Sequence, residues 1–193
     1  MTDKIAALQA LKREGRKIVC IVAWDEGTAR TVDAAGVDVI SVGDSGAASL
    51  QELLVFCAAV RRGTERALVS CDLPAPTVEA ARLLTAAGAE LVKVEGVENV
   101  RAIASAGIPV FAQIETADEA KPMEDAGAAL IDFRHSGPEP GAAAVAAVSI
   151  PVLGGLGGGP WLDGRVRAVF KLLDDAIDAY VDDVRKARPV KGD

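Results

Sequence analysis

One short phrase recurs along the sequence: an alanine–glycine pair followed at once by a run of aliphatic, often β-branched residues. Its four clearest instances begin at Ala35-Gly36, Ala87-Gly88, Ala106-Gly107 and Ala126-Gly127. A glycine directly after a helix supplies the left-handed conformation that ends it. The runs that follow are too short for helices and too continuously apolar for strands with one face in water. The phrase therefore predicts helices alternating with parallel strands that are buried on both faces.

Three further apolar runs extend the series to seven predicted strands. These runs are 17–23, 66–71 and 150–153. Residues 165–170 could form the eighth strand or simply open the last helix. Seven or eight βα units without a linker predict one domain over residues 1–193, a small (β/α)8 TIM-type barrel with a C-terminal helix. The alternative is an open flavodoxin-like sheet, because 193 residues are few for a barrel.

Composition and charge exclude several classes of protein. Half of the residues are hydrophobic and 25% are charged, which excludes a disordered chain. The net charge of −7 argues against a broad nucleic-acid-binding face. No apolar run approaches the roughly 18 residues of a membrane span, and the first residues lack the apolar core of a signal peptide. We therefore expect a cytoplasmic protein without a nucleic-acid or membrane partner.

Polar side chains gather at the carboxyl ends of the predicted strands, where barrels of this class carry their active sites. In chain order they are Asp25, Asp44, Ser45, Asp72, Lys93, Glu95, Gln113, Glu115, Asp132 and Arg134. A single strand-end aspartate is commonly a helix N-cap, but carboxylates that converge from four consecutive strands repel one another unless a cation lies among them. Oxygen ligands suit Mg²⁺. The single histidine and the absence of a Cys-x-x-Cys pair exclude most zinc sites.

Lys93 and Glu95 lie two residues apart, and so they face the same side of their strand. If that side is the barrel interior, Lys93 is a positive charge near the metal that can hold a substrate carboxylate. The alternative is a simple ion pair between Lys93 and Glu95 at the barrel mouth.

Several stretches along residues 17–185 resemble, in order, the ketopantoate hydroxymethyltransferase family of the phosphoenolpyruvate mutase/isocitrate lyase superfamily. The most specific are Val42-Gly-Asp-Ser45 and Val92-Lys-Val-Glu-Gly96, with Asp72-Leu-Pro74 between them. The resemblance implies a (β/α)8 barrel in a homo-oligomer. It also implies a transferase that adds a one-carbon unit from 5,10-methylenetetrahydrofolate to a 2-oxo acid.

The resemblance also assigns roles to residues. Asp44 and Asp72 match the family's Mg²⁺ ligands, with Glu95 close by, and Ser45 and Lys93 match the residues that hold the substrate carboxylate. In such a reaction the metal stabilises the enolate that forms when a proton leaves C3 of the 2-oxo acid. The new carbon–carbon bond then forms at that carbon.

The sequence departs from the family where the chemistry is decided. Gln113 replaces a histidine, and it can hold a substrate oxygen but cannot carry a proton. Arg134 stands where the family has its glutamate base, and Glu115 and Asp132 are the nearby candidates to replace that base. Alternatively, Arg134 binds an anionic group that the family's substrate lacks. The family's longer loops after the second, third and fifth strands are also missing.

These departures leave three interpretations of function. The first is a Mg²⁺-dependent, hydroxymethyltransferase-like enzyme that forms a carbon–carbon bond next to a 2-oxo acid. The second is a folate-independent aldolase or C–C lyase on a 2-oxo acid, since the missing loops would help hold the folate and exclude water. The third is a non-catalytic ligand-binding or partner subunit. The apolar stripe of the last helix, over 172–184, either caps the barrel or lies against a neighbouring subunit in a homo-oligomer.

Overall fold

Eight parallel strands close into a barrel, each paired with the next and β8 with β1. The computed structural model describes residues 3–43, 49–155 and 158–186. The strands are β1 (Ile18–Val22), β2 (Val39–Val42), β3 (Leu68–Asp72), β4 (Leu91–Glu95), β5 (Val110–Ile114), β6 (Leu130–Phe133), β7 (Val152–Gly154) and β8 (Gly164–Ala168). The predicted barrel is confirmed, and the open-sheet alternative is wrong.

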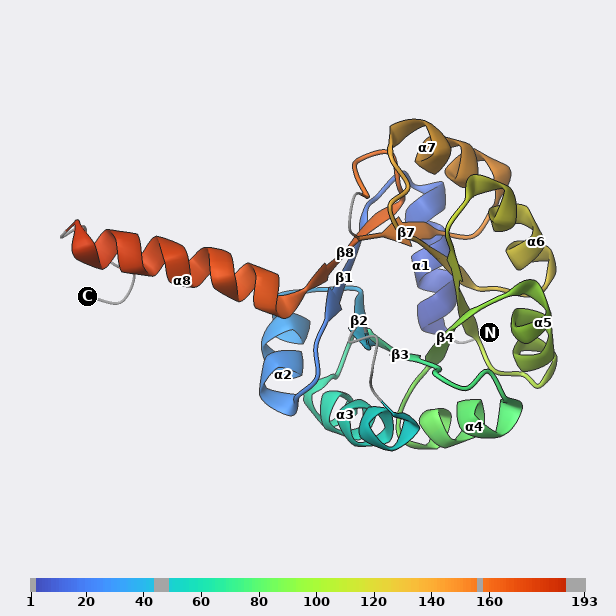
Figure 1. The fold of residues 1–193 in the computed structure, drawn as a ribbon, viewed down its shortest axis with the longest axis horizontal. Coiled ribbons are helices and arrows are strands. Elements are labelled where there is room, and N and C mark those ends of the chain that lie inside the picture. The colour runs from blue at the N-terminus through green and yellow to red at the C-terminus, as the bar shows by residue number, and fades with distance from the viewer. Residues whose placement is uncertain (1–2, 44–48, 156–157, 187–193) are drawn as a thin grey trace.

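Helices follow the strands around the outside of the barrel (Figure 1). They are α1 (Asp3–Arg13), α2 (Glu26–Ala34), α3 (Leu50–Gly63), α4 (Val78–Ala86), α5 (Val97–Ser105), α6 (Ala120–Asp125) with the short 3-10 turn η1 (Ala117–Glu119) before it, α7 (Pro138–Ala147) and α8 (Val169–Arg185). The glycines of the four recurring phrases all have positive φ, between 80° and 114°. Each therefore ends a helix as the sequence pattern predicts. Among the helices that the structure describes, none has the length and apolar character needed to cross a bilayer.

Helix α1 closes the amino end of the barrel. Its Ile5 and Leu8 are buried against an apolar layer of inward-facing strand residues. This layer consists of Ile18, Cys20, Val39, Leu68, Leu91, Phe111, Leu130 and Leu153. The Nζ of Lys12 lies 3.0 Å from an Asp163 carboxylate oxygen and donates to the carbonyls of Val145 and Ile150. These contacts fix α1 across the bottom of the barrel.

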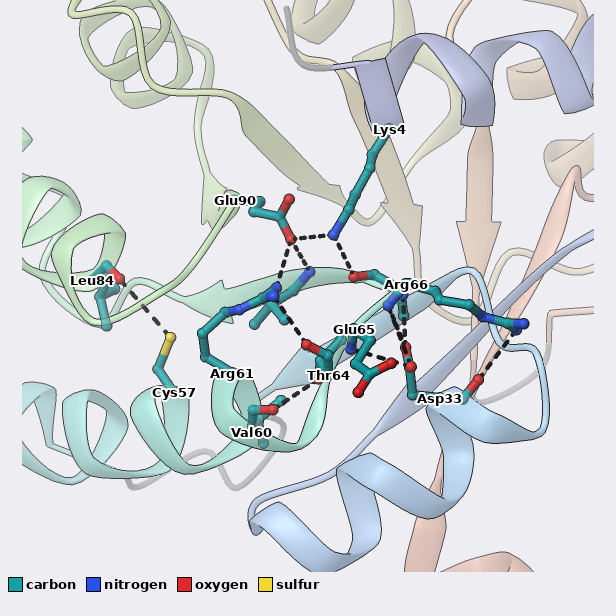
Figure 2. A network of polar contacts seen from close by, with 12 residues as sticks. Lys4, Asp33, Cys57, Val60, Arg61, Thr64, Glu65, Arg66, Leu84 and Glu90 are labelled. Carbon is teal, nitrogen blue, oxygen red and sulfur yellow. Dashed lines mark hydrogen bonds and ion pairs between the residues drawn. The ribbon is translucent and has the colours of Figure 1, made fainter.

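A polar network at the same end joins α1, α2 and the segment before β3 (Figure 2). The buried Asp33 carboxylate accepts backbone N–H groups of Glu65, Arg66 and Ala67, the last at 2.7 Å. Burial alone would raise the pKa of Asp33, but these donors lower it below its usual range. Lys4 donates to the carbonyl of Ala67 and so joins the network from α1. At the amino end of the barrel these polar groups therefore stabilise the fold.

Strand β8 settles the ambiguous segment of the sequence. Residues 164–168 form the strand, and helix α8 begins at Val169, so the expected strand at 165–170 is confirmed except for its last two residues. Figure 1 shows that α8 extends away from the barrel and does not cap its mouth. Phe170, Leu172 and Leu173 on this helix are 43–51% exposed, and Val19 on the outer side of β1 is 44% exposed.

Candidate active site at the carboxyl ends of the strands

The ends of β3 to β6 bring the predicted polar residues into one region. Asp72 is the last residue of β3 and is paired in register with Lys93 of β4. Glu95, which ends β4, is paired with Gln113 of β5, and Gln113 with Asp132 of β6. Because side chains alternate along a strand, these positions face the barrel interior, above the apolar layer that α1 closes.

Lys93 is the centre of this region. Its side chain is 4% exposed, and its Nζ lies 3.0 Å from Asp132 Oδ2 and 3.7 Å from Asp72 Oδ1. The ammonium also lies 5.0 Å from the centroid of the Phe111 ring beneath it. Burial alone would lower the pKa of Lys93, but Asp132 and Asp72 raise it above its usual range. Lys93 is therefore a fixed cation and not a nucleophile.

Asp132 joins Lys93 to Arg134. Its side chain is 2% exposed, and its Oδ2 lies 3.6 Å from the Nε of Arg134 as well as close to Lys93. Its Oδ1 is buried and has no hydrogen-bond partner among the described residues. A buried carboxylate is costly unless cations and donors surround it. The second oxygen of Asp132 could therefore accept a ligand's proton or hydrogen-bond donor.

Asp72 is held against the backbone at the end of β2. A Cβ at Gly43, which has a φ of 146°, would lie 2.1 Å from the carboxylate carbon of Asp72. Glycine is therefore needed there, and the carboxylate lies beside the residue that precedes Asp44 in the sequence. Asp44 and Ser45 themselves fall outside the described residues. The Asp72 carboxylate is the kind of oxygen donor that a hard cation such as Mg²⁺ prefers.

The described residues hold only part of the expected metal site. Within them, no group of three or more His, Cys, Asp or Glu side chains is arranged to hold a metal ion. The side-chain amide of Gln113 donates to Glu95 Oε1, so the alternative pair between Lys93 and Glu95 is wrong: Lys93 pairs with Asp132 and Asp72. Two carboxylates, Asp72 and Glu95, remain at adjacent strand ends for a third ligand to complete.

Two of the strand-end acids differ in their surroundings from the central group. Asp25 caps α2, since its Oδ1 accepts the backbone N–H of Thr28 at 2.9 Å. That hydrogen bond lowers the pKa of Asp25. Glu115 lies just beyond β5 and is exposed, and its backbone N–H donates to Glu119 Oε2. Asp25 is therefore the simple helix cap that strand-end aspartates commonly are.

A cavity of about 250 Å³ opens beside Lys93 on the side of β6, β8 and β1. Its lining comprises Val22, Lys93, Asp132, Arg134, Gly155, Arg165, Val166, Arg167, Ala168, Phe170 and Lys171. The contribution of β8 and the start of α8 was not predicted from the sequence. The signal available there was the spacing of basic residues in Arg165-Val-Arg167, four residues before Lys171.

Known proteins resemble this chain in sequence. The model of the ketopantoate hydroxymethyltransferase family matches residues 3–117. A 3-methyl-2-oxobutanoate hydroxymethyltransferase from a Cyanothece species is 36% identical over 215 residues, covering 86% of this chain and 82% of the relative. One from Xanthomonas euvesicatoria pv. vesicatoria is 34% identical over 215 residues, covering 88% and 79%. Because these alignments are longer than the chain, both relatives carry segments opposite gaps in it.

Solved structures share the fold at low sequence identity. A 2,3-dimethylmalate lyase of the PEP mutase/isocitrate lyase superfamily matches with a TM-score of 0.70 and 15% identity, covering 96% of this chain and 87% of that one. A phosphonopyruvate hydrolase in complex with oxalate and Mg²⁺ matches with a TM-score of 0.67 and 17% identity, covering 100% and 90%. At such identities the likeness establishes the barrel architecture.

Proposed function

The chain belongs to the ketopantoate hydroxymethyltransferase family, a family of enzymes, and from this premise we propose that it is a Mg²⁺-dependent enzyme acting on a 2-oxo acid. The reaction forms a carbon–carbon bond at the carbon next to the keto group. The observation that carries the proposal is the arrangement around Lys93, a buried cation that pairs with Asp72 and Asp132 and lines a cavity in which a small acid could bind.

The metal would be held by Asp72 and Glu95 together with Asp44. When bound, Mg²⁺ supplies a Lewis acid that stabilises the negative charge developing on the keto oxygen as the C3 proton leaves. The cradle that Gly43 leaves for the Asp72 carboxylate supports this assignment. The structural neighbour determined with oxalate and Mg²⁺ supports it at the level of the fold.

The remaining residues bind and orient the substrate. Lys93 and Ser45 attract its carboxylate, and Lys93 does so as a cation whose position is fixed by two ion pairs. Gln113 donates to Glu95 and thereby orients that carboxylate, while a second N–H of the same amide is suited to a substrate oxygen. The positive charge remains at Lys93 throughout the neutral pH range, because the pKa of Lys93 is raised.

Asp132 is the candidate base that the geometry favours. The family position of the base carries Arg134, and Asp132 lies two residues before it on the same face of β6. Its Oδ1 is without a hydrogen-bond partner among the described residues, and Asp132 lines the cavity. Glu115, the other candidate, is exposed beyond the end of β5. Asp132 would take the C3 proton through Oδ1 while Lys93 remains paired with Oδ2.

Proton exchange in D₂O tests this proposal. The protein is incubated with Mg²⁺ and each of 3-methyl-2-oxobutanoate, 2-oxopentanoate and 2-oxoglutarate, without folate, and the C3 proton is followed by NMR. We expect exchange with at least one acid. It should be lost on chelation of Mg²⁺ and in Asp132→Asn, and retained in the matched control Asp125→Asn, an exposed helix position. Binding of these acids with no exchange of any of them would favour a non-catalytic binding subunit.

A folate-independent aldolase or C–C lyase is the second candidate. It is favoured by the alignments, in which the relatives carry segments that this chain lacks. Such segments would cover the mouth and help to hold a large co-substrate. Release of a 2-oxo acid from 4-hydroxy-2-oxo acids without folate would support it. Product formation only in the presence of 5,10-methylenetetrahydrofolate would support the hydroxymethyltransferase.

Self-association into a homo-oligomer is part of the proposal. Helix α8 projects from the barrel with exposed Leu172 and Leu173, and Val19 is exposed on the outer side of β1. We expect α8 of one copy to cover the outer side of β1 and β8 of another. Light scattering should give an oligomer that the double variant Leu172→Asp/Leu173→Asp converts to monomers, and a monomeric wild type would contradict this. Location in the cytoplasm, without nucleic-acid or membrane partners, stays a prediction.

A further inference from the structure

The cavity beside Lys93 carries more basic than acidic side chains. Of the described residues that line it, Lys93, Arg134 and Lys171 are basic and Asp132 is acidic. Arg165 and Arg167 line it from β8, but their side chains lie on the outer side of that strand, where Arg167 pairs with Asp175 at 3.4 Å. The family's uncharged substrate side chain would gain nothing from such a lining. A cavity with this charge is suited to a ligand that brings a negative group of its own.

Asp132 lies between two of these cations. Its Oδ2 lies 3.0 Å from the Nζ of Lys93 and 3.6 Å from the Nε of Arg134, so one carboxylate is shared between two cations. Lys93 is also engaged by Asp72, at 3.7 Å. The shortest of these contacts is that of Lys93 with Asp132, and Arg134 contributes the more exposed cation, with 27% of its side chain exposed against 4% for Lys93.

The chemistry of the two cations separates their roles. Lys93 is buried among carboxylates and serves the metal side of the site. A guanidinium presents five N–H donors in a planar fork that matches a carboxylate with two parallel hydrogen bonds. Arg134 stands at the carboxyl end of β6, at the rim of the cavity, where a group distant from the keto acid would arrive.

Apolar residues line the space around this fork. Val22, Ala168 and Phe170 come from the ends of β1 and β8 and from the start of α8. The Phe170 ring is fixed by stacking on Trp24, with ring centroids 5.9 Å apart. An apolar wall beside a cationic anchor suits a short methylene chain that ends in a carboxylate.

We propose that Arg134 binds a second anionic group of the substrate, so that the substrate is a 2-oxo acid carrying a distal carboxylate. This rests on the proposed function, which places the keto acid on the side of Asp72 and Lys93. Arg134, at the position of the family's base, would thus change which substrates the site accepts, and Asp132 would act as the base in its place.

Calorimetry with matched ligands tests this substrate class. 2-Oxoglutarate and 2-oxopentanoate have the same number of carbons and differ in the distal carboxylate, and 2-oxoadipate and 2-oxohexanoate form a longer pair. With Mg²⁺ present we expect the wild type to bind the better dicarboxylate about 30-fold more tightly than its partner, as for hydrogen bonds between charged groups. The preference should persist when Mg²⁺ is chelated, because Arg134 acts apart from the metal.

Variants of Arg134 identify the anchor. Arg134→Gln should reduce the preference to less than about threefold, and Arg134→Lys should keep part of it, because an ammonium retains the charge without the fork. The matched control Arg101→Gln, at an exposed position on α5, should leave it unchanged. Equal binding of the paired acids by the wild type would overturn the inference, as would a preference that survives Arg134→Gln.

The two proposals fail separately. C3 exchange without a preference for the dicarboxylate would leave the proposed function standing and overturn this inference. A preference that depends on Arg134, with no exchange of any acid, would support the ligand class and contradict the catalytic proposal. Tighter binding of 3-phosphonopyruvate than of both dicarboxylates would overturn the choice of a carboxylate as the distal group.

Discussion

The two sides of the barrel mouth carry opposite charges. On the side of β3 and β4 the strands end in Asp72 and Glu95, within the part of the chain that the family model matches. On the side of β6 and the start of α8 the residues are Arg134 and Lys171, both beyond that match. In the function proposed above, the matched side would stabilise charge during the reaction and the other side would select the ligand. A chain of this fold could then change its substrate while the proposed metal-binding side stays as it was.

Lys93 joins the two sides, and its removal should have the largest effect on stability. Lys93→Met removes the shorter of the two ion pairs of the buried Asp132 and leaves it with Arg134 at 3.6 Å, so we expect a loss of about 3 kcal/mol in the free energy of unfolding, measured by urea denaturation. The double variant Lys93→Met/Asp132→Leu should recover most of it, because no buried charge remains unpaired. Lys121→Met, which removes an exposed lysine, is the matched control. A loss no larger than that of the control would show that the two sides are not coupled through Lys93.

Asp72→Asn tests the acidic side alone. It removes a proposed metal ligand without changing the size of the side chain, so C3 exchange should fall at least about 100-fold. The rise in melting temperature on adding Mg²⁺ should be lost as well. Tight binding of the distal carboxylate should survive, since that belongs to the cationic side. An unchanged response to Mg²⁺ would remove Asp72 from the metal site.

The amino end of the barrel offers a contrast with the mouth. Asp33→Asn should lower the free energy of unfolding by about 2 kcal/mol at pH 7, because three backbone N–H groups lose a charged acceptor. Since the pKa of Asp33 is lowered by folding, its stabilisation is full above the unfolded value of about 3.9 and is lost as the pH falls through the folded value. The difference in the free energy of unfolding between wild type and variant should therefore disappear at acid pH. Ligand affinity at pH 7 should be unchanged.

Arg165 gives the smallest expected effect. It is exposed on β8, so Arg165→Gln should weaken dicarboxylate binding only about two- to threefold. This loss should disappear at about 1 M salt, where the screening length is only about 3 Å. A loss of dicarboxylate affinity as large as that in Arg134→Gln would show that Arg165 on β8, and not Arg134 alone, binds the distal carboxylate.

Sequence alone predicted the barrel because the alanine–glycine phrases mark both a helix end and the following buried strand. Strand β8 was ambiguous for a physical reason: Arg165 and Arg167 lie on its exposed outer side, so it lacks the continuous apolar run of the other strands. In the site, Asp72, Lys93 and Glu95 stood in recognisable motifs. The ion pair of Lys93 with Asp132 was not recognisable, because 39 positions separate the two residues and only the pairing of β4 and β6 with β5 brings them together.

Helix α1 and the apolar layer beside it close the barrel interior at its amino end, so the interior is open only at the carboxyl ends of the strands. Reactants and products must then share the opening at the top. In a two-substrate reaction, the substrate that binds deeper in the barrel would have to bind before the substrate nearer the opening. It could dissociate only after that second molecule had left. Initial-rate measurements with both substrates varied should accordingly give the pattern of an ordered sequence, with the 2-oxo acid as the first to bind.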